Sequence, residues 1–177
     1  MAHPIVIVDY DPAWSGQFEV LRRRIAKALG NLVARIEHVG STAVPGLAAK
    51  PIIDLDVLLA SPDDMSEAVD RLASIGYVHQ GDLGVPGREA FKEQSGGAQP
   101  RSHHLYVFTD SSGEFSRHLA FRDCLRANPQ CAQAYEELKR ALALRFTEDR
   151  VAYNEGKTRF VCEVLQQEFS KSIDEKR

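Results

Sequence analysis

Residues 39–56 read VGSTAVPGLAAKPIIDLD, a run of small, turn-forming residues followed by an apolar segment that carries two aspartates. Glycine, serine and proline interrupt regular structure in the first half of this stretch, whereas residues 52–59 are typical of a strongly apolar strand. Successive side chains of a strand point to opposite faces, so Asp54 and Asp56 share a face, roughly 6–7 Å apart along the strand. The stretch therefore predicts a turn and then a buried strand that presents two carboxylates side by side.

The two carboxylates need compensation inside such an apolar strand. Ionised carboxylates are almost never buried unless they are paired or bind a metal, so we expect a cation or a basic partner. Magnesium is the usual partner of one or two carboxylates together with the phosphates of a nucleotide. The alternative is that one face of the strand is solvated and that Asp54 and Asp56 only keep it soluble.

The turn before the strand favours a phosphate ligand. Gly40 allows backbone N–H groups to approach a phosphate closely, and Ser41 can cap a helix start and donate its hydroxyl. Together with the aspartate pair, this turn predicts a phosphate site beside a metal site. The alternative is a plain connection between one strand and the next element.

The rest of the chain predicts an α+β fold, namely a mixed sheet with flanking helices and a helical carboxyl-terminal layer. A helix is expected from Asp11 to residue 29, and another from Ser61 to Gly76. Further strands are expected over 32–39, 77–79, 88–92 and 103–108. Three further helices are expected: the first covers 114–127, the second begins at Pro129, and the third carries Phe160 to Phe169.

Composition limits the class of protein. With 177 residues and 44% hydrophobic content, the chain fits one domain over 1–177. The net charge of −3 argues against a nucleic-acid or acidic-membrane partner. Its three cysteines fit reduced thiols better than a disulfide framework. No signal-like segment or long apolar run is present, so we expect a cytoplasmic protein without a membrane span.

Residues 37–56, EHVGSTAVPGLAAKPIIDLD, closely resemble the signature of the GrpB family, an uncharacterised family of the nucleotidyltransferase superfamily. Residues 86–91, 103–107, 121–123 and 153–160 also look like blocks of that family, so the resemblance covers nearly the whole chain. It implies a minimal nucleotidyltransferase-like fold. It also implies that Gly40 and Ser41 bind the triphosphate of a nucleotide, and that Asp54 and Asp56 bind magnesium or manganese. GrpB-like domains also occur fused to dephospho-CoA kinase, which suggests nucleotide or coenzyme A metabolism.

The sequence departs from active members of that superfamily at one point. Those members usually add a third carboxylate from a later strand, but residues 103–108 contain no acid. By alternation His104 and Tyr106 share a face, so His104 can take the place of that carboxylate, which would favour manganese or zinc over magnesium. Glu89 is the other candidate third ligand. Alternatively, His104 is satisfied by the aspartates without any metal.

Several basic residues are candidates for phosphate binding. Lys50 precedes the carboxylate strand, Arg88 and Arg101 flank glycine-rich loops expected near the same cleft, and Lys157 begins the last helix beside Gly156. For each, the alternative is an ordinary surface charge. Among the histidines, His38 is expected to be packed and hydrogen-bonded, and nothing in the sequence distinguishes His118.

Three hypotheses follow from these patterns and from the resemblance. The first is a metal-dependent enzyme that moves a nucleoside monophosphate from a nucleoside triphosphate to a small-molecule or protein hydroxyl. The second is a catalytically inactive module that binds a nucleotide or a coenzyme A-like ligand. The third is a protein-interaction partner, such as an antitoxin of the minimal nucleotidyltransferase kind.

Overall fold

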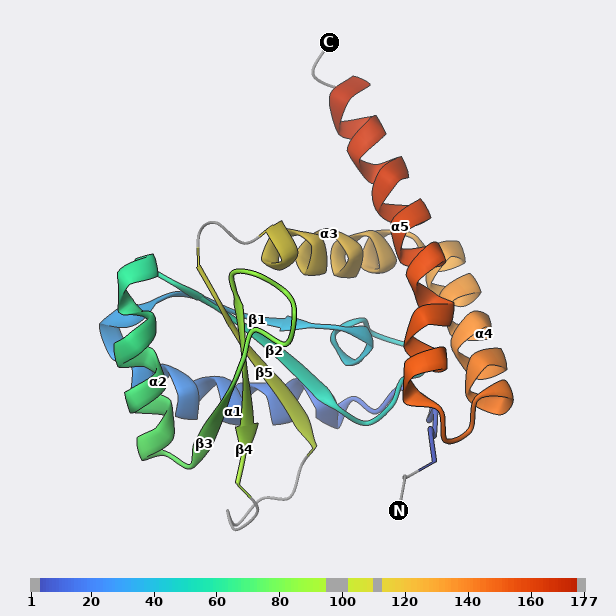
Figure 1. The fold of residues 1–177 in the computed structure, drawn as a ribbon. Helices are drawn as coiled ribbons and strands as arrows, with labels where there is room; N and C mark the ends of the chain where they lie inside the picture. Colours follow the sequence, from blue (N-terminus) through green and yellow to red (C-terminus); the bar gives the residue numbers. More distant parts are fainter. Residues whose placement is uncertain (1–3, 95–101, 110–112, 175–177) are drawn as a thin grey trace.

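A mixed five-stranded sheet forms the centre of the protein in the computed structural model, which describes residues 4–94, 102–109 and 113–174, with side chains up to residue 168. Its strands are β1 (Val33–Val39), β2 (Ile53–Leu59), β5 (His103–Phe108), β4 (Arg88–Glu93) and β3 (Tyr77–Gly81), in that spatial order. Only β2 and β5 run parallel; the other neighbours are antiparallel. The predicted α+β class and its mixed sheet are confirmed (Figure 1).

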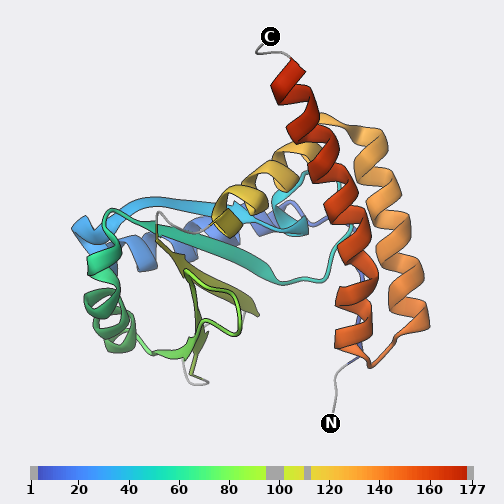
Figure 2. The same cartoon turned by 45° about the horizontal axis from the view of Figure 1, so that its top comes forward.

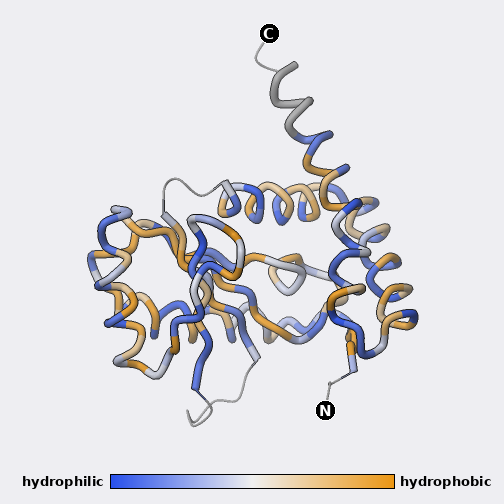
Figure 3. The backbone as a smooth tube through the Cα atoms, in the orientation of Figure 1, coloured by the Kyte–Doolittle hydropathy of each residue, from blue (hydrophilic) through white to orange (hydrophobic). Residues whose placement is uncertain are grey.

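One face of the sheet is covered by α1 (Ala13–Leu29) and α2 (Met65–Ser74). Leu55 and Val57 of β2 are fully buried against this layer, together with Ile25 and Leu29 of α1 and Leu72 of α2. Figure 3 shows long hydrophobic stretches along the central strands. Because side chains alternate along a strand, Asp54 and Asp56 lie on the opposite face, as expected.

The starts of these helices follow local sequence signals. The Asp11 side chain accepts a hydrogen bond from the backbone N–H of Ala13 at 2.8 Å, which caps α1. Ser61 caps a short 3₁₀ turn, Pro62–Asp64, and α2 follows it. The β-branched residues 5–8 form no strand, since Val8 makes only an isolated bridge to Ala49.

The carboxyl-terminal half supplies α3 (Gly113–Ala127), α4 (Pro129–Arg145) and α5 (Arg150–Asp174). In Figures 1 and 2, α3 lies over the second face of the sheet, and α4 and α5 run side by side beyond the sheet. In Figure 3 α3 alternates between hydrophobic and hydrophilic residues, as expected of a helix packed on one side. No helix in the described part of the chain is long and apolar enough to cross a bilayer.

A glycine allows close contact between α4 and α5, and we predict that a side chain at this position destabilises the protein. In Gly156→Ala the new Cβ would lie 2.6 Å from Cδ2 of Leu142, so overpacking should lower the free energy of unfolding by about 1–3 kcal/mol. The matched control is Gly16→Ala in α1, where nothing lies within 4 Å of the new Cβ. Because alanine favours a helix, this control should stabilise the protein by about 0.5–1 kcal/mol. Denaturant unfolding measures both changes, and equal shifts in the two variants would contradict the prediction.

Candidate functional site

The turn after β1 brings Gly40 directly against Asp54. Val39 and Asp54 are paired in the antiparallel register of β1 and β2, and Gly40 has a φ of 70°. A Cβ atom at position 40 would collide with Oδ2 of Asp54. Glycine is therefore required here both by the backbone conformation and by the carboxylate that fills the adjacent space.

Side chains from the helical layer hold the loop that follows this turn. Nη2 of Arg126 in α3 donates to the carbonyl of Ala43 at 2.7 Å. From α4, Glu136 accepts a hydrogen bond from the N–H of Ala48 at 3.0 Å, and Nζ of Lys139 donates to the carbonyl of the same residue. The loop thus has a defined position although it contains only one turn of 3₁₀ helix, Ser41–Ala43.

His38 is packed beneath the turn, as expected. Its ring stacks on Phe18 with centroids 4.6 Å apart, and its Nε2 lies 3.0 Å from Oγ1 of Thr42. Burial lowers the pKa of His38 to about 4, so the imidazole is neutral at neutral pH. His38 therefore supports the turn and contributes no charge to the site.

Asp54 is partly exposed and paired with a histidine. Its side chain is 29% exposed, and its Oδ1 lies 2.7 Å from Nδ1 of His104. The parallel register of β2 and β5 sets this contact, because it places residue 54 opposite residue 104. The arrangement agrees with the alternative in which an aspartate satisfies His104, and a metal-binding role of His104 stays a prediction.

Asp56 is fully buried and is bound by a residue that sequence analysis did not single out. Its Oδ2 lies 2.6 Å from Nδ1 of His118 in α3, while Oδ1 is buried without a hydrogen-bond partner. Burial raises the pKa of Asp56, although the hydrogen bond to His118 opposes this shift. Burial acts to lower the pKa of His118, but its hydrogen bond and the nearby carboxylates outweigh this effect and raise it.

His118 belongs to a second acid–histidine contact. Its Nε2 lies 3.6 Å from Oε2 of Glu114, one helical turn earlier. The spacing of four residues was the only sequence signal, since it places both side chains on one face of a helix. Nothing in the sequence indicated that this face meets Asp56.

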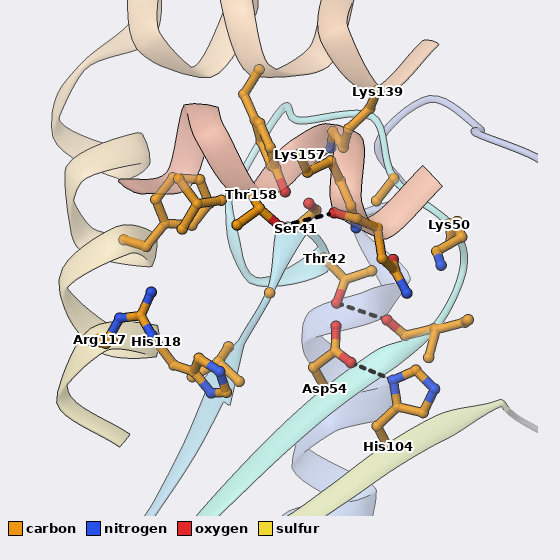
Figure 4. A pocket seen from close by; sticks show the side chains of 18 of the residues that line it. Ser41, Thr42, Lys50, Asp54, His104, Arg117, His118, Lys139, Lys157 and Thr158 are labelled. Carbon is orange, nitrogen blue, oxygen red and sulfur yellow. Dashed lines mark hydrogen bonds and ion pairs between the residues drawn. The ribbon is translucent and has the colours of Figure 1, made fainter. Parts of the chain in front are cut away.

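A cavity of about 560 Å³ opens above these residues, between the sheet, the 40–50 loop and the three carboxyl-terminal helices (Figure 4). It brings together most residues that the sequence had nominated: Gly40, Ser41, Lys50, Asp54, Arg88, His104 and Lys157. Asp56 does not line the cavity, but its partner His118 does. Arg101, also nominated, lies outside the described residues.

Glu89 does not contribute a carboxylate to this cavity. In the antiparallel register of β4 and β5, Arg88 pairs with Phe108 and Glu89 with Val107, so the two neighbours lie on opposite faces. The Glu89 carboxylate instead contacts Nε2 of His79 at 2.6 Å. Glu89 as a third ligand beside Asp54 is therefore wrong, because the alternation of the strand turns it away.

Lysines gather at one side of the cavity. The ammonium groups of Lys50 and Lys157 lie 5.0 and 4.4 Å from the ring centroid of Tyr153, with Arg150 nearby. Burial lowers the pKa of Lys157 to about 8, with Lys50 acting in the same direction. Burial also lowers the pKa of Lys139 to about 7, and the charge of Glu136 opposes that shift.

Several cations that line the cavity have no acidic partner in the part of the chain that the structure describes. Among the described residues, Lys50, Lys157, Arg88 and Arg150 form no ion pair. The carboxylates that line the cavity are Asp54 and Glu114, which already contact His104 and Arg117. Lys50, Lys157 and Arg88 are half-buried, whereas Arg150 is exposed. Partly desolvated charges without partners are costly, so the cavity suits a ligand that carries several negative charges.

Part of the cavity wall is apolar and aromatic. This part is lined by Phe121, Tyr135, Val161 and Leu165 from the three carboxyl-terminal helices, and the ammonium group of Lys139 lies 4.9 Å from the ring centroid of Tyr135. Phe121 and Tyr135 meet edge to face, with ring centroids 5.1 Å apart. The cavity thus combines a cationic side with an apolar wall, which suits a ligand that has both anionic groups and a flat ring system.

The carboxylates fit a metal ion only if the ligand helps to hold it. No cluster of at least three His, Cys, Asp or Glu side chains within the described residues is arranged to bind a metal. The carboxylate of Asp54 is partly exposed at the cavity, whereas Oδ1 of Asp56 is buried just outside the cavity lining, without a hydrogen-bond partner among the described residues; both are oxygen donors of the kind that magnesium binds. Magnesium is often bound by one or two carboxylates plus phosphate oxygens and water, so the donor set fits such an ion.

We predict that the Gly40–Asp54 contact supports both stability and the site. Gly40→Ala places an alanine in the left-handed backbone region and also makes its Cβ collide with Asp54. Gly46→Ala is the control: its φ is 80°, but nothing lies within 4 Å of the new Cβ, so only the backbone is strained. The control should lose about 1–2 kcal/mol of unfolding free energy, and Gly40→Ala about 1–3 kcal/mol more. Denaturant unfolding of the two variants measures the difference; a Gly40→Ala loss no larger than that of the control would refute the close contact.

Comparison with known proteins finds relatives in sequence that point to one family. The family model described as "GrpB protein" matches residues 4–167. UPF0157 protein YqkA of Bacillus subtilis is 32% identical, over 89% of this chain and 45% of YqkA. Glutamate-rich protein GrpB of Alkalihalophilus pseudofirmus is 32% identical, over 92% of this chain and 95% of its own length. Dephospho-CoA kinase of Mycolicibacterium paratuberculosis is 29% identical, over 85% of this chain and 42% of the kinase. This chain thus spans less than half of the first and third of these relatives.

Solved structures agree with these matches. The crystal structure of conserved protein GrpB from Enterococcus faecalis superposes with a TM-score of 0.83 at 34% identity, over 94% of this chain and 99% of that one. Cid1 in complex with its short product ApU gives a TM-score of 0.53 at 14% identity, over 75% of this chain and 42% of Cid1, a likeness of fold alone. The nucleotidyltransferase-like fold that the sequence resemblance implied is confirmed. With a family model that matches nearly its whole length and a close structural counterpart, this chain belongs to the GrpB family.

Proposed function

We propose that this protein is a metal-dependent nucleotidyltransferase that moves a nucleoside monophosphate from a nucleoside triphosphate to an acceptor hydroxyl. The observation that carries the proposal is a group of cations beside the Gly40–Ser41 turn, in the same cavity as Asp54, that form no ion pair with any acid the structure describes. A triphosphate supplies the negative charge that these cations lack. The proposal places the reaction in the cytoplasm, where the composition led us to expect the protein.

Each part of the cavity has a role in this proposal. Lys50, Lys157 and the Ser41 hydroxyl bind the triphosphate, and the apolar wall takes the base. Asp54 and Oδ1 of Asp56 would hold magnesium or manganese, with His104 beside Asp54. A bound ion would neutralise charge on the phosphates. The acceptor oxygen bonds to the α-phosphorus as the bridging bond to the β-phosphate breaks, so that pyrophosphate leaves and the hydroxyl proton passes to water. The contact with His118 would fix the orientation of the buried Asp56 carboxylate.

Transfer of label tests the activity directly. The protein is incubated with Mg²⁺ or Mn²⁺, with nucleoside triphosphates labelled at the α-phosphate, and with a panel of small-molecule and protein acceptors. We expect label on an acceptor, and a loss of about 100-fold or more in Asp54→Asn, because outer partners of metal ligands alone contribute 10–100-fold. Asp54→Asn preserves shape, so the loss should come without unfolding.

The matched control for this experiment is Asp63→Asn, which changes an exposed aspartate in the turn before α2. It should retain the wild-type rate. Absence of transfer across the whole panel, or transfer that Asp54→Asn leaves intact, would reject the enzyme proposal.

A second candidate is a module that binds a nucleotide or a coenzyme A-like ligand without chemistry. Two observations favour it: His118 occupies one oxygen of Asp56, and β5 offers His104 where an acid would complete a three-carboxylate site. The similarity to a dephospho-CoA kinase makes coenzyme A and its precursors reasonable ligands to test. Calorimetry distinguishes the candidates, because binding that is independent of metal and of Asp54, without turnover, selects the module.

The lysines predict how binding depends on pH. In the free protein the pKa of Lys139 is about 7 and that of Lys157 about 8, so both lose charge as pH rises through this window. A bound anion raises both pKa values, so affinity is highest below pH 7 and falls as pH increases. Calorimetric titration with tripolyphosphate across this window should show the fall.

A variant comparison separates the lysines from the titration of the probe itself. Lys157→Gln should bind tripolyphosphate about tenfold more weakly below pH 7 and show a shallower decline. Lys92→Gln, which alters an exposed lysine of β4, should behave as wild type. Identical pH profiles for wild type and Lys157→Gln would contradict the assignment.

A further inference from the structure

Arg88 is the least satisfied cation of the cavity. It is the first residue of β4, and its guanidinium lies over the ring of Tyr106, with Cζ 4.6 Å from the centroid. Among the described residues, its buried Nε has no hydrogen-bond partner, and no acid forms an ion pair with its guanidinium. Buried N–H groups are nearly always bonded, so this group needs an explanation.

The other cavity arginine is already engaged. Arg117 of α3 forms an ion pair with Glu114, and its side chain is 44% exposed. Arg88 forms no ion pair with a described acid, and its Nε atom is shielded from water. An anion that enters the cavity therefore gains more from Arg88 than from Arg117.

Arg88 also stands apart from the lysine group. Burial is the largest influence on the pKa values of Lys50, Lys139 and Lys157. The charges that act on them next are those of the neighbouring lysines and arginines and of nearby acids. Arg88 instead acts on Asp56 and Tyr106. Asp54 influences both groups, since its charge reaches Lys50, Lys157 and Tyr106. Asp54 is thus the residue that connects two cationic regions of one cavity.

The ring contacts show the same division, because Lys50 and Lys157 lie over Tyr153 of α5, whereas Arg88 lies over Tyr106 of β5. In Figure 4 the labelled lysines Lys50, Lys139 and Lys157 lie on one side of Asp54, and His118 lies on the other. A triphosphate held by the lysines would leave the Arg88 side open. The acceptor must approach through the space that remains near Asp54, because its hydroxyl has to reach the phosphate that is transferred.

We propose that Arg88 binds a negatively charged group, a phosphate or a carboxylate, on the acceptor substrate. This inference rests on the proposed function, because it assigns the nucleotide to the lysine group. The planar guanidinium offers paired N–H donors that match the oxygens of either group. Arg88 then orients the acceptor hydroxyl and takes no part in bond breaking.

A two-ligand binding experiment tests this subsite. The full chain is saturated with Mg²⁺ and an ATP analogue whose α,β-bridge is a methylene group, and inorganic phosphate is then titrated by calorimetry. Phosphate should still bind, and Arg88→Gln should weaken it about tenfold while the affinity for the analogue changes less than about twofold. Lys157→Gln should do the reverse. Arg159→Gln, an arginine whose side chain is 89% exposed on α5, is the matched control.

The outcomes separate the two proposals. If saturation with the analogue abolishes phosphate binding, or if Arg88→Gln weakens both ligands equally, the cavity has a single anion site and the inference is overturned. If the analogue does not bind but phosphate binding still depends on Arg88, the proposed function fails and the anion subsite stands.

A kinetic arm identifies the acceptor group. In the label-transfer assay, acceptors that carry a phosphate are compared with their carboxylate and neutral counterparts. Arg88→Gln should raise KM for the preferred anionic acceptor about tenfold, with little change in kcat, and should leave neutral acceptors unaffected. A kcat loss with unchanged KM, or equal losses for neutral and anionic acceptors, would contradict a role in acceptor binding.

Discussion

The close contact between Asp54 and the backbone of Gly40 is the constraint on which the rest of the site depends. It exists because Val39 and Asp54 are register partners, so the end of β1 and the start of β2 meet where the chain turns. Any side chain at position 40 would displace the carboxylate. The glycine of the turn therefore does more than release the backbone: it creates the space in which Asp54 faces the cavity and contacts His104.

The helical layer completes what the turn begins. Arg126, Glu136 and Lys139 bind backbone groups of the loop, so polar atoms that a short loop leaves unsatisfied find partners in α3 and α4. The same layer provides Lys157 and the apolar wall. Sheet and helices are thus joined at the cavity, and a ligand bound there contacts both.

The two aspartates, neighbours on one strand, have different surroundings. Asp54 opens to the cavity, whereas Asp56 is fully buried and depends on His118 for compensation. Strand periodicity predicted that they share a face, and the cost of burying a carboxylate predicted a cation or a basic partner. The structure places His104 against Asp54 and His118 against Asp56. Periodicity did not predict which carboxylate would be exposed, because that depends on where α3 crosses the sheet.

The sequence by itself determined the α+β class, the order of the helices and strands, and the turn with its aspartate strand, because hydrophobic period, caps and turn residues are local properties. Its long signature also identified the family. Only the tertiary structure decided that His118 binds Asp56, that Glu89 turns away, and that Arg88 has no acidic partner within the described part of the chain. These features depend on residues that are distant in the chain. Their geometry follows from strand register and helix packing, which no local pattern encodes.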